Sequence, residues 1–169
     1  MSDPLAVQVG EALARAGAML AVAESCTGGL IAQRVTAVAG SSAWFDRGFV
    51  VYSNAAKEQM LGVAPALLLA HGAVSVPAVL AMAAGVLARS QAGVALAVSG
   101  IAGPGGGSAA KPVGSVCIAW QRAGAPATAQ ALHFAGGRDA VRLAAADAAL
   151  RGVLACLGGD RDARLHAPG

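Results

Sequence analysis

The chain carries little charge and few aromatic side chains. Only 12% of its 169 residues are charged and 4% are aromatic, the formal net charge is +3, and no run of Lys or Arg occurs. A nucleic-acid-binding protein is expected to show a basic stripe or patch, so this class receives little support. Apolar residues make up 56% of the chain. This balance predicts a folded chain with a core and argues against disorder.

Cysteine is also scarce, and its three positions, Cys26, Cys117 and Cys156, are widely spaced. An odd number of distant cysteines argues against a disulfide framework or a zinc cluster, and the three histidines form no metal-binding pattern. The first residues lack the basic region and cleavage site of a signal peptide. The longest apolar helical stretch, 78–88, is too short to cross a bilayer. We therefore expect a cytoplasmic protein with no metal and no membrane partner.

Apolar periodicity divides the chain into alternating helices and strands. The expected helices are 5–16, 28–38, 54–61, 63–69, 76–89 and 138–157. The expected strands are 18–22, 49–52, 94–98, 115–120 and 129–134, the last two joined as a hairpin.

No repeat or linker interrupts this pattern, and a single domain over residues 1–169 is expected, with 158–169 as a frayed polar tail. Helices interspersed with buried strands predict an α/β fold. We expect a three-layer α/β/α sandwich around a mixed, largely parallel sheet.

Two of the expected strands end in a serine that is followed by glycines. These turns begin at Ser25 and Ser99. If both strands are parallel in one sheet, the turns meet at one edge and present backbone N–H groups to a phosphate or an oxyanion. Neither turn matches a Walker A or a dinucleotide-binding motif. The simpler alternatives are that Ser25 or Thr27 only caps a helix and that the second turn is a flexible loop.

Lysine and tyrosine, two residue types that can act in catalysis, are rare in this chain. Lys57 and Lys111 are the only lysines, and Tyr52 is the only tyrosine. A lysine beside a serine in an apolar pocket has a lowered pKa and activates the hydroxyl, an established variant of the serine nucleophile. Ser25 and Lys57 are therefore candidates for such a pair, with Cys26 as a less favoured nucleophile. A solvated helix lysine is the simpler alternative for Lys57.

Six motifs in order resemble the CinA C-terminal domain family. They are Ala-Glu-Ser-Cys-Thr-Gly-Gly at 23–29, Gly-Ser-Ser-Ala-Trp-Phe at 40–45, Gly-Phe-Val-Val-Tyr-Ser-Asn at 48–54 with Lys57 after it, His-Gly-Ala-Val-Ser at 71–75, Ser-Gly-Ile-Ala-Gly-Pro-Gly-Gly at 99–106 and Lys-Pro-Val-Gly at 111–114. The resemblance extends from the first helix to about residue 157. Members of this family include amidohydrolases that convert nicotinamide mononucleotide (NMN) to nicotinate mononucleotide and ammonia. In larger relatives the domain follows an N-terminal domain. None is expected here, so the resemblance implies a free-standing amidohydrolase.

The resemblance implies roles for individual residues. Ser25 becomes the nucleophile, Lys57 its base, and Tyr52 a residue that assists proton transfer or positions the pair. Substrate contacts are implied for Thr27, Gly28, Gly29, Ser42, Ser99, Gly100 and Arg142, with Arg138 as the alternative arginine.

The implied substrate is NMN, with no cofactor, and a homodimer or larger homo-oligomer is expected. The alternative is a non-catalytic nucleotide-binding or competence-related interaction domain.

Overall fold

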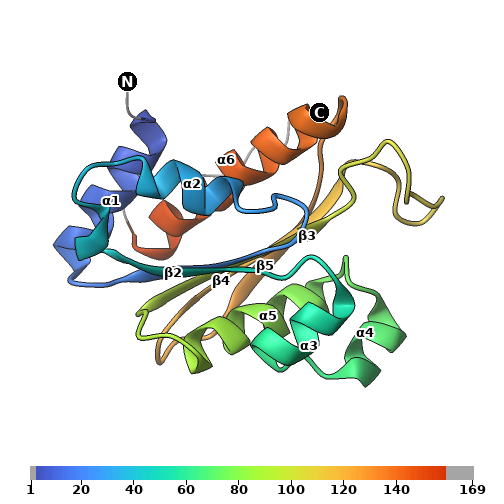
Figure 1. Cartoon of the computed structure of the whole chain (residues 1–169), viewed down its shortest axis with the longest axis horizontal. Helices are drawn as coiled ribbons and strands as arrows, with labels where there is room; N and C mark the ends of the chain where they lie inside the picture. Colours follow the sequence, from blue (N-terminus) through green and yellow to red (C-terminus); the bar gives the residue numbers. More distant parts are fainter. Residues whose placement is uncertain (1–2, 159–169) are drawn as a thin grey trace.

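The structure is a computed structural model that describes residues 3–158, and it shows one five-stranded sheet between two layers of helices (Figure 1). The strands follow the order β2-β1-β3-β4-β5. Their bounds are β1 Leu20–Glu24, β2 Phe45–Val50, β3 Val94–Gly100, β4 Ser115–Arg122 and β5 Thr128–His133. The expected tail, apart from Gly158, lies outside the described residues.

Three helices cover each face of the sheet. The helices α1, α2 and α6 pack together on one face, and α3, α4 and α5 pack together on the other (Figure 1). Their bounds are α1 Pro4–Ala16, α2 Leu30–Thr36, α3 Asn54–Leu61, α4 Pro65–His71, α5 Val76–Ala88 and α6 Arg138–Cys156, with a short 3-10 helix η1 at Ser41–Ala43. The expected three-layer α/β/α architecture is confirmed. Within residues 3–158, no helix is long and apolar enough to cross a membrane.

The sheet is mixed. Strand β1 pairs in parallel with both β2 and β3, whereas β4 pairs antiparallel with β3 and with β5. The predicted hairpin is confirmed as β4 and β5, whose connection is short enough for antiparallel neighbours.

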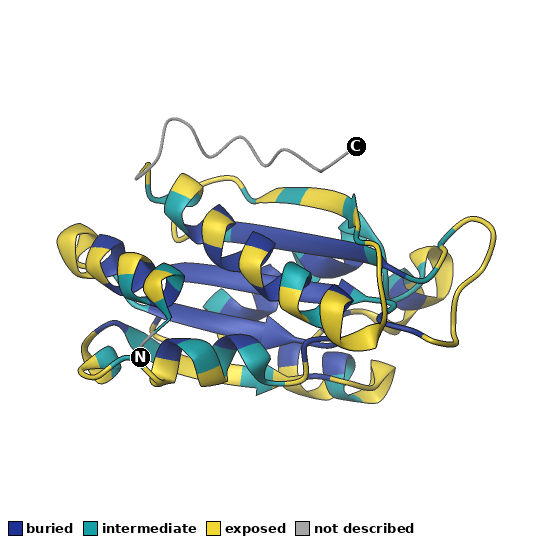
Figure 2. Ribbon diagram, turned by 90° about the horizontal axis from the view of Figure 1, so that it is seen from above, coloured by how far each residue is buried: buried dark blue, intermediate teal, exposed yellow. Residues whose placement is uncertain are grey.

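The two faces of the central strands differ in side-chain size. Successive residues of a strand point to opposite faces, so Leu20 and Val22 face the layer of α1 and α6, while Ala21 and Ala23 face α5. Strand β3 repeats this alternation. The small alanines allow α5 to lie close to the sheet. Figure 2 shows the central strands buried in dark blue between the partly exposed helices.

Three strands bring their carboxyl ends to one edge of the sheet. Glu24 at the end of β1 pairs with Val50 of β2 and with Val98 of β3. The Ser25 and Ser99 turns therefore lie beside each other, as expected, and the Ser25 amide donates to the Val98 carbonyl at 3.0 Å. Open α/β sheets bind their ligands at such an edge.

Strand β2 begins and ends earlier than the predicted strand 49–52. It stops at Val50, so Val51 and Tyr52 lie in the connection to α3. The apolar run Phe49–Tyr52 reflects burial of Val51 in the core beyond the strand. Outside the ladder, the carbonyls of Val51 and Tyr52 are free to accept hydrogen bonds from side chains.

Candidate active site

A pocket of about 220 Å³ opens where the three strands end. Its walls come from the Ser25 turn, the loop after β2, the first turns of α3, the segment before α5, the Ser99 turn and the start of α6. The lining residues are Ser25, Cys26, Tyr52, Asn54, Lys57, Ala73, Val74, Ser99, Gly100, Ala102 and Arg138.

Ser25 and Lys57 form a pair in this pocket. The Lys57 Nζ atom lies 3.1 Å from Ser25 Oγ, and both residues are buried, Lys57 with only 1% of its surface exposed. Helix α3 presents the lysine from its first turns, because Ser53 caps the helix through a hydrogen bond from the Ala56 amide. The juxtaposition of a serine hydroxyl and a buried amine is the arrangement that a Ser-Lys mechanism needs.

The surroundings of Lys57 favour its neutral form. Burial lowers the pKa of this lysine, because removal of the ammonium from water penalises the charged state. No salt bridge within residues 3–158 includes Lys57. Its Nζ atom donates to the Val51 carbonyl at 2.9 Å and to the Tyr52 carbonyl at 3.4 Å. The same Nζ atom donates to Ser25 Oγ at 3.1 Å, so one buried amine contacts the serine hydroxyl and both carbonyls.

The Ser25 turn is anchored by the carboxylate of Glu24. This side chain is 1% exposed and accepts hydrogen bonds from the Gly29, Ile31 and Ala32 amides at 3.1, 3.1 and 2.8 Å. The positive end of α2 is thus neutralised by an internal anion. The amino terminus of α2 is therefore closed to an anionic ligand by the protein's own carboxylate.

The backbone N–H groups of Gly28 and Gly29, which were predicted to contact a ligand, are already hydrogen-bonded within the protein. The Gly29 amide bonds to Glu24, and the Gly28 amide bonds to the Ser25 carbonyl at 3.1 Å. These two glycines are needed for the backbone itself, which has φ of +58° at Gly28 and +97° at Gly29. Within the described part of the chain, the amides of Cys26 and Thr27 donate to no backbone carbonyl. They are the donors available beside Ser25.

Cys26 is unsuited to act as the nucleophile. Burial raises the pKa of its thiol to about 11, so the reactive thiolate is absent near neutral pH. Its Sγ atom instead packs toward the second turn, where a Cβ on Gly100 would lie 3.0 Å from it and 2.7 Å from a methyl group of Val116. Gly100 is therefore required for the close contact between the two turns.

Arg138 and Tyr52 lie at the rim of the pocket. Tyr52 is 60% exposed, and its hydroxyl accepts a hydrogen bond from Arg138 Nη2 at 2.9 Å. Arg138 Nη1 also donates to the Gly103 carbonyl at 2.7 Å. The guanidinium thus links the loop after β2 to the glycine-rich loop after β3. The Tyr52 hydroxyl contacts the arginine, and only the backbone carbonyl of this residue contacts Lys57.

Arg142 lies outside the pocket, in contrast to its expected role. One turn beyond Arg138 on α6, its Nε and Nη2 atoms donate to the Cys26 and Thr27 carbonyls at 3.2 and 3.0 Å. Both arginines face the same edge because they are four residues apart on one helix. Arg142 reaches only the outer side of the Ser25 turn, which it holds in place. Arg138 is the arginine that lines the pocket.

Two hydroxyl residues of the expected site also lie elsewhere. Ser42 is in η1, before β2, and the register places the start of β2 beside Leu20, at the opposite end of the sheet from Ser25. The structure therefore does not bring Ser42 to the pocket of its own chain. Thr27 is fully buried, and its hydroxyl has no partner among the described residues.

Four residues to which the sequence analysis gave no role also line the pocket. Asn54 enters from the first turn of α3, Ala73 and Val74 form the wall before α5, and Ala102 follows the Ser99 turn. All four belong to the motifs at 48–54, 71–75 and 99–106, so the resemblance to the family was the signal that could have found them.

Comparison with known proteins shows which family the chain belongs to. The model of the CinA C-terminal domain matches residues 2–157. The chain belongs to the CinA C-terminal domain family. The nicotinamide-nucleotide amidohydrolase PncC of Escherichia coli K12 is 52% identical over 147 residues, covering 87% of this chain and 89% of that protein. The PncC of Pseudomonas putida is 51% identical, covering 89% and 93%.

Solved structures of the family share this fold. The competence/damage inducible protein CihA from Agrobacterium tumefaciens superposes with a TM-score of 0.87 at 48% identity, covering 91% of this chain and 93% of that chain. The competence damage-inducible protein A from Klebsiella pneumoniae MGH 78578 has a TM-score of 0.88 at 39% identity, covering 91% and 95%.

Proposed function

We propose that this chain is an amidohydrolase that deamidates NMN to nicotinate mononucleotide and ammonia. The observation that carries this proposal is the buried amine of Lys57, 3.1 Å from the Ser25 hydroxyl in a pocket at the carboxyl edge of the sheet. An amide is a poor electrophile, so its hydrolysis requires an activated nucleophile, and a neutral lysine supplies the base. Two relatives that this chain matches over most of their length are named nicotinamide-nucleotide amidohydrolases.

In the first half of the reaction, the acyl group of the carboxamide is transferred to Ser25. The neutral Lys57 amine takes the hydroxyl proton while Ser25 Oγ forms a bond to the carboxamide carbon. The resulting ammonium then returns this proton to the amide nitrogen as the carbon–nitrogen bond breaks and ammonia leaves. The product of this half is an ester between Ser25 and the carboxyl group of nicotinate mononucleotide.

Water completes the reaction. Lys57, neutral again, takes a proton from a water molecule that attacks the ester, and Ser25 leaves with the proton from Lys57. Both tetrahedral intermediates carry an oxyanion. The Cys26 and Thr27 amides, which donate to no backbone carbonyl, lie beside the nucleophile and stabilise this oxyanion. One such donor contributes about 3–4 kcal/mol in comparable sites.

The remaining pocket residues orient the carboxamide end of the substrate. We assign Ser99 and Gly100 to the wall that faces Ser25, and Arg138 with Tyr52 to the rim that closes over the pyridine ring. Arg142, Gly28 and Gly29 act indirectly, by fixing the turn that carries Ser25.

The decisive experiment is incubation of purified protein with NMN, with ammonia and nicotinate mononucleotide measured together. Equal amounts of both products are expected, and Ser25→Ala should form neither. If NMN binds but no ammonia is released at high protein concentration, the chain is a non-catalytic nucleotide-binding domain.

We further propose that the chain forms a homodimer or larger homo-oligomer. The formal net charge of +3 and the 12% content of charged residues offer little electrostatic repulsion between copies of the chain. Light scattering after size-exclusion chromatography should give a mass at least twice that of the chain, and a monomer would contradict this.

A further inference from the structure

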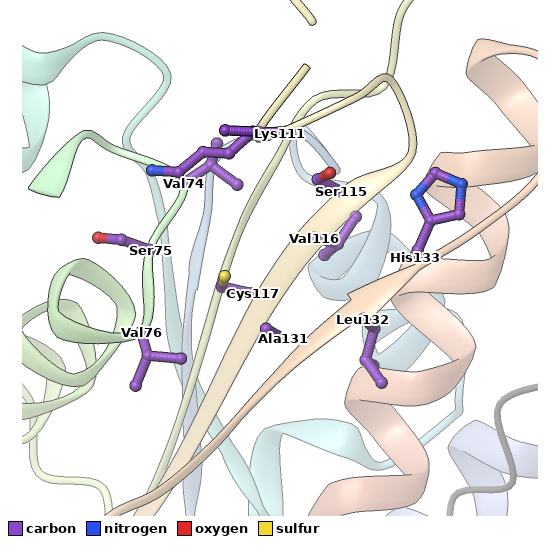
Figure 3. A pocket seen from close by; sticks show the side chains of 11 residues that line it. Val74, Ser75, Val76, Lys111, Ser115, Val116, Cys117, Ala131, Leu132 and His133 are labelled. Carbon is purple, nitrogen blue, oxygen red and sulfur yellow. The ribbon is translucent and has the colours of Figure 1, made fainter. Parts of the chain in front are cut away.

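A second pocket lies on the same face of the sheet, beside the candidate active site. It has a volume of about 400 Å³ and lies over β4 and β5, in front of the first residues of α5 (Figure 3). Figure 3 shows Lys111 and Val74 on one side of it, His133 on the other and Cys117 between them.

The two pockets adjoin. Val74 lines both of them. Ser99 of the active-site pocket pairs with Cys117 of the second pocket across β3 and β4, and paired residues of neighbouring strands point to the same face. His133 pairs with Ser115, one strand further along the sheet. Strands are about 4.8 Å apart, so the second pocket extends about 10 Å from Ser99.

The active-site pocket is too small to enclose a whole mononucleotide. Pockets that bury small organic ligands measure roughly 300–1,000 Å³, whereas the pocket around Ser25 measures about 220 Å³. It is suited to the carboxamide and its ring. The two pockets taken together fall within the usual range.

The lining of the second pocket is suited to an anion. It contains Lys111, His133 and Ser115, and no Asp or Glu is among the described residues that line it. The hydroxyl of Ser75, which also lines it, is already bonded to the Gly72 carbonyl and the Ala78 amide. The Lys111 ammonium donates one hydrogen bond to the His71 carbonyl at 2.8 Å. This bond holds the Nζ atom beside the end of α4, on the Val74 side of the pocket rim (Figure 3), and leaves two N–H donors for a ligand.

We propose that this second pocket binds the ribose phosphate half of the mononucleotide, with Lys111 as the charged partner of the phosphate. The inference rests on the proposed function for the identity of the ligand. It gives a role to the Lys-Pro-Val-Gly motif at 111–114, which the chemistry at Ser25 does not use. It also separates two tasks by position, with amide hydrolysis at the ends of β1 and β3 and phosphate recognition over β4 and β5.

The test compares NMN with nicotinamide riboside, which lacks the phosphate. Lys111→Met should lower kcat/KM for NMN by about 10- to 100-fold, the range for one charge-assisted hydrogen bond, and should change kcat/KM for the riboside less than about twofold. Lys111→Arg should restore most of the activity on NMN. Arg151→Met is the matched control, because it removes an exposed cation of α6 outside both pockets, and it should affect neither substrate.

Arg138→Met tests the competing position of the phosphate. If this variant discriminates between NMN and the riboside while Lys111→Met does not, the phosphate lies at the rim of the active site and the proposal is wrong. Equal losses on both substrates in Lys111→Met would also overturn it, since the lysine would then act on the fold.

A binding measurement separates this proposal from the proposed function. Calorimetric titration with ribose 5-phosphate should show binding to the wild type and to Arg151→Met, and binding to Lys111→Met at least about tenfold weaker. If the protein binds ribose 5-phosphate in this Lys111-dependent manner but releases no ammonia from NMN, the proposed function fails and the subsite stands. If it deamidates NMN but binds ribose 5-phosphate equally with and without Lys111, the subsite fails and the proposed function stands.

Discussion

The Ser25 turn and the Ser99 turn have similar sequences and lie side by side at one edge of the sheet. Both place a buried serine directly after, or at the end of, a parallel strand, and both continue into glycine. Their surroundings differ in the basic side chain that contacts Ser25. Lys57 reaches the Ser25 hydroxyl at 3.1 Å, because the loop after β2 and helix α3 lie on the β1 side of the edge.

The backbone after each serine also differs. The first turn is held on one side by Glu24 and on the other by Arg142, and it leads into a helix. The second turn leads into the loop 101–114, which is tied to the rest of the site by Arg138 at the Gly103 carbonyl. The comparison shows that similar local sequences acquire different roles from the side chains that tertiary structure places beside them.

The largest expected effect is the loss of either member of the Ser25 and Lys57 pair. Ser25→Ala and Lys57→Met should each lower kcat for NMN by about 1,000-fold or more, and the double variant should be little worse than either, because groups that act as one unit are not additive. Steady-state ammonia release measures this, with circular dichroism as the control for folding. Additive losses would show that the two residues act independently.

The pH dependence of the rate should reflect the pKa of Lys57. Burial lowers the pKa of Lys57, and only the neutral amine accepts the Ser25 proton. The value of kcat/KM should therefore rise about tenfold per pH unit below this pKa and level off above it. The profile is measured between pH 5 and 10 with NMN. A rate that falls as the pH rises through this range would exclude a neutral lysine as the base.

Ser99→Ala should have a moderate effect and sharpen the contrast between the turns. Loss of one neutral hydrogen bond to the substrate costs about 0.5–1.5 kcal/mol, so kcat/KM should fall by about 3- to 10-fold. The same ammonia assay provides the measurement. A loss as large as that of Ser25→Ala would make the second serine an equal participant and would break the comparison.

Cys26→Ala should have the smallest effect on catalysis. The thiol, with its pKa raised to about 11, stays protonated near neutral pH and contributes packing between the turns. Activity within about twofold of the wild type is expected, together with a loss of stability of about 1 kcal/mol in urea denaturation. An inactive Cys26→Ala beside an active Ser25→Ala would reassign the nucleophile to the thiol.

Local sequence patterns were sufficient for most of the fold. Alternating apolar segments predicted five strands and six helices in the order found, because each segment buries one face or stripe and is bounded by glycine, proline or capping residues. The boundary errors have a tertiary cause. The run 49–52 predicted a strand, but Val51 is buried in the core beyond the end of β2. An apolar run does not show whether its residues are buried in a strand or in the segment that follows it.

The sequence by itself also predicted which residues would carry the proposed chemistry, since Lys57 is one of two lysines and Ser25 lies in a strand–turn–helix motif. Only the tertiary structure decided how they are combined. The order β2-β1-β3 brings the lysine of α3 to the serine after β1. The reach of each side chain places Arg138 at the pocket and Arg142 behind the turn. The start of β2 places Ser42 at the far end of the sheet.

The physical reason is that residue type and spacing determine local conformation. The neighbours of a side chain depend instead on strand order and register, which arise from packing of the whole chain.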